Sequence, residues 1–344
     1  MFIKWNDSAV RLTGRWSRLP EDVTDPHVFV KPTAAYTTAT AAGSYFELAF
    51  KGRNLLLHFD LGYLAQPFPH LWIQVDNGAR MEVPVDRHLR IDAMTDGDHI
   101  VKVTYKGGME QLHRWYLPLN GKISFIGADA EAPGVLPEDN RRIIEFIGDS
   151  ITEGVLIDLD YTTEVENVID QFNRPYQDDN CATYAYLTAE NLNLRPMFQA
   201  YGAIGLTRTG CGAVPRAGAI YPYVYDGVPY TGETPDIIMI NHGANDRITG
   251  AKEYIERYEE FIAQAFEMRP NALIVCLGAF CGAFDAELRN MTERWNASHE
   301  KKIHFISSNG WVPLEPLHPT REGHQIIAKH LTPILKKIIE ENMD

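Results

Sequence analysis

The sequence predicts two domains of different fold class: an all-β sandwich, followed by a doubly wound α/β domain with a parallel sheet. Three observations support this expectation. Apolar and polar residues alternate in the first part of the chain, and continuous apolar runs alternate with helical patterns over about the last 200 residues. A segment rich in proline, glycine and acidic residues separates the two patterns. The length of 344 residues suits two such domains.

Period-two alternation predicts the strands of the first domain. Segments with an apolar residue at every second position lie at 46–50, 55–59, 71–75, 81–85, 101–105 and 121–127. The Asp76-Asn77-Gly78 turn between the third and fourth of these segments is a strong signal for a β-hairpin. Because no helical pattern occurs before about residue 127, we expect an antiparallel, jelly-roll-like sandwich over residues 1–129.

A linker is predicted at residues 130–140, whose sequence AEAPGVLPEDN has the composition of a domain boundary. The second domain then covers residues 141–344. Its continuous apolar runs indicate strands that are buried on both faces, as in a parallel sheet, and they lie at 143–147, near 197, and at 237–240, 272–280 and 302–308.

Helical periodicity separates these strands and completes the α/β pattern. Apolar residues recur at i, i+3 and i+4 over residues 254–266 and again over residues 326–338. Strands and helices in alternation predict a three-layer, doubly wound domain. The stretch from Val155 to Asp179 has weak periodicity, and we expect it to form an insertion over the site.

Composition excludes several classes of function. A formal net charge of −14 argues against a nucleic-acid partner, because phosphate binding requires a basic surface. No apolar run reaches the ~18 residues that a membrane helix needs, and the first residues do not resemble a secretion signal. We therefore expect a cytoplasmic protein that uses no metal and no cofactor, and the sequence leaves homo-oligomerisation open.

The four cysteines agree with a reducing compartment. They are too few and too irregularly spaced for a zinc site or a redox pair, so we interpret them as small core hydrophobes: Cys181, Cys211, Cys276 and Cys281.

Polar residues follow four of the predicted parallel strands at their carboxyl ends, where ligands bind in open α/β sheets. The first strand ends in Gly148-Asp149-Ser150, and the second is followed by Gly202 and Gly205. The third leads into Asn241–Asp246, and the last precedes a segment that contains Glu315 and His318. These strand ends contain the parts of a serine hydrolase site.

Each of these residues has a chemical role in such a site. A serine hydroxyl is a weak nucleophile and needs a base, for which His318 is the candidate, with Ser150 as nucleophile. Glu315 precedes His318 by three residues and could fix its tautomer. The N–H groups of Ser150 and Gly205 and the side-chain amide of Asn245 could form an oxyanion hole.

The segments GDSITEG, YGAIGLT, GAND and EPLHP resemble the four sequence blocks of the SGNH (GDSL-type) hydrolase family. The resemblance covers residues 141–344, and it implies Ser150 as nucleophile, Gly205 and Asn245 as oxyanion donors and His318 as base. A sandwich ahead of such a domain is similar to carbohydrate esterase family two, which removes acetyl groups from plant polysaccharides. The family has Asp where this chain has Glu315, and some esterases of the subgroup orient the histidine by a backbone carbonyl instead.

Each motif taken alone is also consistent with an ordinary turn or helix cap, because Gly, Asp, Asn and Ser are typical of such positions. The same caution applies to the candidate substrate-binding residues, Trp115, Trp311 and Arg208, since tryptophans are mostly core residues and arginines mostly solvated.

The sequence therefore predicts a carboxylic ester hydrolase that acts on short acyl esters, chiefly O-acetyl groups of sugars or oligosaccharides. Three alternatives stay open. The first is an acyltransferase that uses the same acyl-enzyme, and the second is a lipase or thioesterase for longer acyl chains. The third is a carbohydrate-binding protein whose hydrolase domain is inactive.

Overall fold

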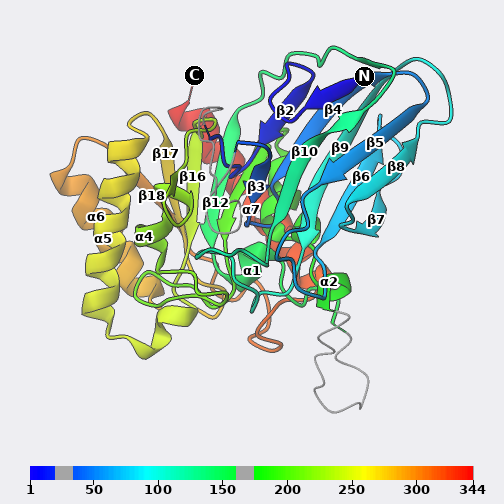
Figure 1. Ribbon diagram of the computed structural model, residues 1–344. Helices are drawn as coiled ribbons and strands as arrows, with labels where there is room; N and C mark the ends of the chain where they lie inside the picture. The colour runs from blue at the N-terminus through cyan, green and yellow to red at the C-terminus, as the bar shows by residue number, and fades with distance from the viewer. Residues whose placement is uncertain (20–33, 160–173, 344) are drawn as a thin grey trace.

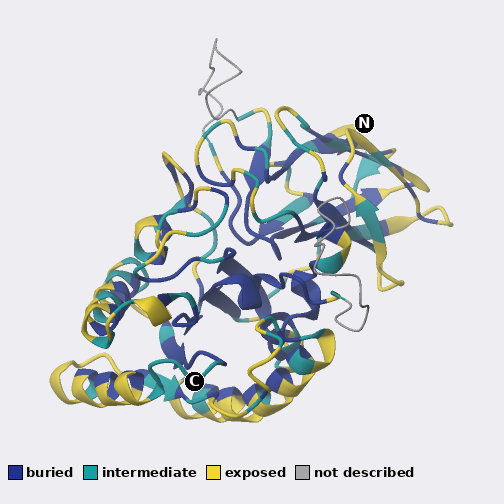
Figure 2. Cartoon of the chain, turned by 90° about the horizontal axis from the view of Figure 1, so that it is seen from below, coloured by how far each residue is buried: buried dark blue, intermediate teal, exposed yellow. Residues whose placement is uncertain are grey.

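The computed structural model describes residues 1–19, 34–159 and 174–343, and it places an antiparallel sandwich beside a parallel α/β domain (Figure 1). Both predicted fold classes are confirmed. Within the described residues, no helix is long and apolar enough to cross a membrane. Figure 2 shows buried strands in the middle of the molecule and helices with exposed outer faces at its periphery.

Two sheets form the sandwich. The first has the order β1-β10-β5-β8, with β3 also pairing with β10. Its strands are β1 (Phe2–Lys4), β3 (Thr37–Ala39), β5 (Asn54–Phe59), β8 (His88–Asp92) and β10 (Ile123–Asp129). The second has the order β11-β4-β9-β6-β7, with β2 pairing with β4. Its strands are β2 (Val10–Thr13), β4 (Tyr45–Lys51), β6 (His70–Val75), β7 (Met81–Pro84), β9 (Asp98–Gly107) and β11 (Ala132–Pro133).

The hairpin expected at Asp76-Asn77-Gly78 is present, because β6 pairs antiparallel with β7 and sets Ile73 opposite Met81. Consecutive strands β4 and β5 instead lie in different sheets, so their two apolar faces meet across the sandwich. Phe46 of β4 and Phe125 of β10 stack with ring centroids 4.0 Å apart in this core. Period-two alternation therefore produces one buried face on each sheet.

The predicted linker contributes to the sandwich. Strand β11 lies within residues 130–140 and pairs with the end of β4, with Ala132 opposite Lys51. Residues 134–142 then lead to β12 without further regular structure.

The parallel sheet of the second domain has the order β13-β12-β16-β17-β18. All four pairings are parallel. The strands are β12 (Ile143–Gly148), β13 (Arg195–Ala200), β16 (Ile237–Asn241), β17 (Leu273–Leu277) and β18 (Ile303–Ile306). A two-stranded ribbon of β14 (Tyr223–Tyr225) and β15 (Val228–Pro229) lies outside this sheet. Every residue of β12, β13 and β16 is buried, as the continuous apolar runs predict.

Helices cover both faces of this sheet. Ile238 and Ile240 of β16 pack into one core with α4 (Ala217–Ile220), α5 (Ala251–Met268) and α6 (Asp285–Ser298). Ile237 and Met239 point to the opposite core, with α3 (Tyr184–Asn191) and α7 (Arg321–Asn342). The short elements are α1 (Ser150–Glu153), α2 (Arg174–Gln177) and the 3-10 turns at Asn180–Ala182 and Asn245–Ile248. The domain is thus the predicted three-layer α/β/α structure.

The two domains share buried contacts. Arg15 of the sandwich donates from Nε to Glu145 of β12 at 2.8 Å, and both side chains are about 1 % exposed. The loop between β9 and β10, residues 108–122, brings Trp115 into the core of the α/β domain. Lys106 of β9 donates to the backbone carbonyls of Pro175 and Asp178. The sandwich therefore packs tightly against the α/β domain.

Candidate active site

The site lies where the strand order of the parallel sheet reverses. Strand β12 is the first in the chain but occupies an inner position, with β13 on one side and β16 on the other. Such a switch point leaves a crevice beyond the carboxyl ends of the strands, where open α/β sheets bind ligands. Residues Asp149 and Ser150 follow β12 directly at this point.

A tight turn positions Ser150 as the first residue of α1. Asp149 caps the helix, because its Oδ1 accepts the Ile151 N–H at 3.0 Å. Gly154 ends the helix in the left-handed region at φ 91°, where a residue with a Cβ would be strained. With one side chain at its start and one glycine at its end, the motif holds the serine in a single short turn.

His318 meets Ser150 from the other end of the chain. Its Nε2 lies 2.9 Å from Ser150 Oγ, across 168 residues of sequence. His318 belongs to the segment between β18 and α7, whose N-cap Thr320 accepts the Gly323 N–H. The structure thus brings together the predicted nucleophile and base at hydrogen-bond distance.

Two charges and burial act on the His318 imidazole. Burial lowers the pKa of His318 below its ordinary value, the Glu110 carboxylate raises it, and the Arg174 guanidinium lowers it. The net direction is downward, so His318 is neutral at pH 7 and can accept the serine proton.

Glu315 does not occupy the position expected of the third triad member. Its side chain is exposed, and the described part of the chain contains no hydrogen bond between Glu315 and His318. Glu315 does not act on the pKa of His318 either, whereas Glu110 of the sandwich does. The i, i+3 spacing does not bring the two side chains together here, because Glu315 and His318 lie in a segment without helical or strand geometry, and the role of Glu315 stays a prediction.

The three expected oxyanion donors differ in whether they already donate to a protein acceptor. Within the described residues, no acceptor is recorded for the Ser150 N–H, so this donor is open. The Gly205 N–H is instead donated to the Arg208 carbonyl at 3.0 Å, so this donor is engaged and its expected oxyanion role stays a prediction. The sequence could not show this, because the bond closes a local turn that depends on the loop conformation.

Asn245 lies at the site but its amide is engaged. Its Nδ2 donates to Asp149 Oδ2 and to the Ile204 carbonyl, each at 3.2 Å. Both bonds are long, so an oxyanion can compete for these hydrogens. Burial raises the pKa of Asp149 to about 7, and the negative charge of Asp246 adds to this effect.

Buried polar contacts also hold the loops around the site together. Asp246 accepts both the N–H and the hydroxyl of Thr207, at 2.8 and 2.6 Å, and so links the loop after β16 to the loop after β13. His324 accepts the Tyr184 N–H at 3.0 Å and stacks on its ring, so it packs at the start of α7. Burial lowers the pKa of His324 to about 3.

The three candidate substrate-binding residues lie in different environments. Trp115 is only 4 % exposed and packs in the core of the α/β domain, so its burial does not favour the expected contact with substrate. Trp311 is half-buried and stacks on His330 of α7, which covers one face of its indole. Arg208 is exposed, and its backbone carbonyl accepts the Gly205 N–H.

The sandwich contributes to the site in a way that the sequence did not indicate. Arg114 of the β9–β10 loop forms a buried ion pair with Glu153, the last residue of the helix that begins at Ser150. Glu110 of the same loop pairs with Arg174 at 3.0 Å. The Arg114 N–H also donates to the Gly212 carbonyl of the α/β domain. No motif or periodicity marks these residues, because their placement depends on how the two domains dock.

Within the described residues, no cluster of three or more His, Cys, Asp or Glu side chains has the arrangement of a metal site.

Comparison with protein-family models matches residues 146–326, more than half of the chain, to the GDSL-like lipase/acylhydrolase family. The matched range includes both Ser150 and His318. It begins inside β12 and leaves the sandwich outside the match.

Two curated proteins are related in sequence. The chain is 30 % identical over 246 residues to the cellulase/esterase CelE of Acetivibrio thermocellus, a match that covers 63 % of this chain and 28 % of that protein. It thus spans only about a quarter of this relative's length. It is also 25 % identical over 304 residues to an acetylxylan esterase/glucomannan deacetylase of Cellvibrio japonicus, covering 78 % of this chain and 79 % of that protein.

The whole two-domain arrangement occurs in a solved structure. A family two carbohydrate esterase from Cellvibrio japonicus superimposes with a TM-score of 0.78 at 20 % identity, over 99 % of this chain and 98 % of that one. At this identity the similarity concerns the fold, and it includes the sandwich that the family match leaves out.

Proposed function

Because the chain belongs to the GDSL-like lipase/acylhydrolase family, we propose that it is a serine esterase that removes short acyl groups, chiefly acetyl, from sugars or oligosaccharides. The observation that carries this proposal is the 2.9 Å contact between Ser150 Oγ and His318 Nε2. A serine and a neutral imidazole at this distance have the geometry required for acyl transfer to the serine.

In the first half of the reaction, Ser150 Oγ attacks the ester carbonyl while its proton moves to His318 Nε2. The open Ser150 N–H donates to the oxyanion, and the Asn245 amide adds a second donor by releasing one of its long bonds. The carbonyl then re-forms, the bond to the alcohol breaks, and His318 returns the proton to the departing alkoxide. The acyl group remains on Ser150.

In the second half, water replaces the alcohol. His318 Nε2 takes a proton from the water as the oxygen attacks the acyl-enzyme, and it then protonates Ser150 Oγ as the carboxylic acid leaves. The reaction consumes one ester and one water and produces one alcohol and one acid, so it requires no further reactant.

Relatives support the choice of a sugar ester. The related protein of Cellvibrio japonicus is named as an acetylxylan esterase and glucomannan deacetylase, and the relative of Acetivibrio thermocellus as a cellulase and esterase. Both names combine ester hydrolysis with plant polysaccharides. A cytoplasmic location remains a prediction, and it would suit imported acetylated oligosaccharides better than intact polymer.

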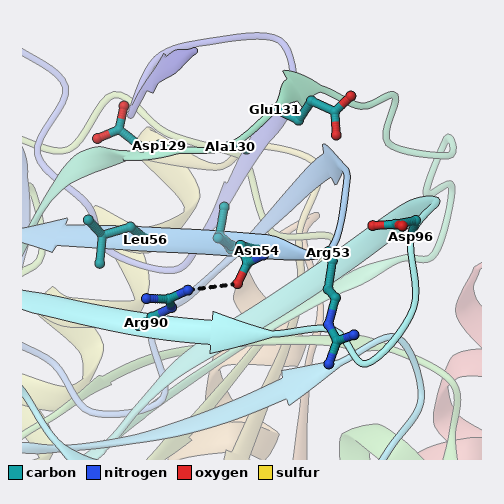
Figure 3. A pocket seen from close by; sticks show the side chains of 9 residues that line it. Arg53, Asn54, Leu56, Arg90, Asp96, Asp129, Ala130 and Glu131 are labelled. Atoms are coloured by element: carbon teal, nitrogen blue, oxygen red, sulfur yellow. Dashed lines mark hydrogen bonds between the residues drawn. The ribbon is translucent and has the colours of Figure 1, made fainter.

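A pocket on the sandwich is lined without aromatic residues, and a purely carbohydrate-binding protein stays an alternative. The pocket lies beside β5, β8 and β10 (Figure 3), and its volume is about 420 Å³. Its lining consists of charged, polar and small apolar residues: Arg53, Asn54, Leu55, Leu56, Arg90, Asp96, Asp129, Ala130 and Glu131. It offers no aromatic ring on which a sugar could stack.

Turnover of acetylated xylo- and manno-oligosaccharides, measured beside 4-nitrophenyl acetate, tests the proposal. The Ser150→Ala variant should lose about 10³-fold or more in kcat on every ester, because it removes the nucleophile. Unchanged turnover in this variant would place the activity at another site or assign the protein a binding role.

The same assay separates the remaining alternatives. A series of nitrophenyl esters of increasing chain length should favour acetate, and a preference for chains of about eight carbons or more would indicate a lipase or thioesterase. Product analysis with an added alcohol acceptor would reveal an acyltransferase, because that acceptor would then carry the acyl group in place of water.

A further inference from the structure

Glu110 reaches the active site from the sandwich domain. It follows β9 by three residues, in the 108–122 loop that docks on the α/β domain. Backbone contacts hold this loop in place, since Arg114 donates to Gly212 and a Cβ at Gly212 would collide with the Leu112 carbonyl. The position of Glu110 is therefore determined by the packing of the two domains.

A buried arginine orients the Glu110 carboxylate. Arg174 Nη2 donates to Glu110 Oε1 at 3.0 Å, and Arg174 Nε donates to Asp178 at 3.0 Å. The Arg174 side chain is about 2 % exposed, whereas that of Glu110 is 13 % exposed. Gln111 also donates to Oε1 at 3.3 Å. One carboxylate oxygen is thus held by protein donors while the residue remains reachable from solvent.

The second oxygen, Oε2, lies directly over Gly202. A Cβ at this glycine would be 2.8 Å from the Glu110 carboxyl carbon and closer still to Oε2, so a larger residue here would require the carboxylate to move. Within the described residues, Oε2 has no recorded hydrogen bond. Oε2 is therefore an oriented acceptor that receives no donor from the described residues.

This acceptor is close to the reacting groups. Gly202 follows the end of β13, where the Tyr201 N–H donates to the Gly148 carbonyl, two residues before Ser150. The negative charge of the Glu110 carboxylate also raises the pKa of His318. Glu110 thus lies over the loop that follows β13, and its charge acts on the His318 imidazole.

We propose that Glu110 is a substrate-positioning residue whose Oε2 accepts a hydrogen bond from a free hydroxyl of the sugar that carries the ester. This inference rests on the proposed function, because it assigns Glu110 to the alcohol portion of the same substrate. A hydroxyl bound to a carboxylate forms a charge-assisted bond that is stronger than one between neutral groups. Because Arg174 already orients the carboxylate, little conformational entropy is lost when the sugar binds.

Three esters test this assignment: 4-nitrophenyl acetate, a monoacetylated xylose with free hydroxyls, and fully acetylated xylose with none. At about pH 8, well above the pKa of His318, Glu110→Gln should lower kcat/KM for the monoacetylated sugar about tenfold, and Glu110→Ala should lower it further. The other two esters should keep wild-type kcat/KM within about twofold, because they offer no hydroxyl to the carboxylate.

The matched control is Glu233→Gln. Arg195 pairs with Glu233 at 2.8 Å and with Asp139 at 3.8 Å, as Arg174 pairs with Glu110 and Asp178. Arg195 is the first residue of β13, at the end of the strand away from Ser150. Glu233→Gln therefore removes the same kind of partner from an arginine, and all three esters should retain wild-type kcat/KM.

Two outcomes would overturn the inference while the proposed function stands. Equal losses on all three esters in Glu110→Gln would mean that the carboxylate acts through His318 or through the fold. Unchanged kcat/KM on all three would mean that Glu110 does not touch the sugar. A wild-type protein that hydrolyses only 4-nitrophenyl acetate would instead remove the proposed function and this inference together.

Discussion

The strand ends of the parallel sheet and the 108–122 loop of the sandwich both deliver side chains to the site, yet by different means. The strand ends carry Ser150 and Asn245 in short turns that their own sequence shapes, with a cap at Asp149 and a left-handed glycine at 154. The loop carries Glu110 and Arg114, which reach the site only because the sandwich is docked there. Local sequence thus determines one half of the site, and the domain interface determines the other.

The two regions also differ in the kind of polar contact that holds them. Among the described residues near the nucleophile, the strand ends use hydrogen bonds to backbone groups, such as Thr207 to Asp246. The sandwich uses buried ion pairs, Arg114 with Glu153 and Arg15 with Glu145. A buried ion pair costs much desolvation, so it adds little net stability, but losing one partner leaves an unpaired charge. The interface is therefore sensitive to single substitutions.

The largest effect on stability and turnover is expected when the Arg114–Glu153 ion pair is broken. Arg114→Met should lower the free energy of unfolding by about 3–5 kcal/mol, because it leaves Glu153 buried without its cation. Since Glu153 ends the helix that begins at Ser150, kcat of the folded variant should also fall, by about ten- to a hundredfold. Urea unfolding and 4-nitrophenyl acetate turnover measure the two effects.

Arg15→Met is the control that sharpens this comparison. Its partner Glu145 lies inside β12, before the strand end, so stability should fall by a similar amount while kcat of the folded protein is retained. If both variants lost kcat equally, the Arg114 pair would have no special role in positioning Ser150.

A smaller effect is expected on the pH dependence of the reaction. His318 must be neutral to act as the base, so kcat/KM falls as pH falls through its pKa. Because burial lowers this pKa, the midpoint for 4-nitrophenyl acetate should lie below 6.5. Glu110→Gln removes a charge that raises the pKa and should move the midpoint lower, whereas Arg174→Met removes a charge that lowers it and should move the midpoint higher.

Profiles measured from about pH 4 to pH 8 would check these directions. A midpoint that stays the same in both variants would show that the sandwich loop and α2 do not influence the base. Opposite shifts would show that the charges of Glu110 and Arg174 both act on the pKa of His318.

The smallest effect is expected at Glu315. Its exposed side chain has no bond to His318 in the described part of the chain, so Glu315→Gln should change kcat/KM by less than about twofold. A loss of about a hundredfold or more would restore Glu315 as the residue that orients the imidazole. The measurement therefore decides whether Glu315 orients the His318 imidazole, as the motif spacing predicts, or whether His318 acts without an acidic partner.

Most of the fold could be predicted because its signals are local. Continuous apolar runs predicted β12, β16, β17 and β18, and the Asp76-Asn77-Gly78 turn predicted the β6–β7 hairpin, since burial on two faces and a tight turn each require particular residues. The order of strands in each sheet, including the separation of β4 from β5, could not be predicted in the same way. It depends on contacts between segments far apart in the chain.

The sequence by itself predicted the candidate nucleophile and base, because Ser150 directly follows a continuous apolar run and His318 lies in a motif shortly before the last helical pattern. Only the tertiary structure decided which carboxylate acts on the pKa of His318 and which N–H groups of the described residues are open. Glu315 was predicted from spacing but is exposed, whereas Glu110 comes from another domain and is held by Arg174. Spacing along the chain predicts contacts only within regular elements, and these groups meet across loops and a domain interface.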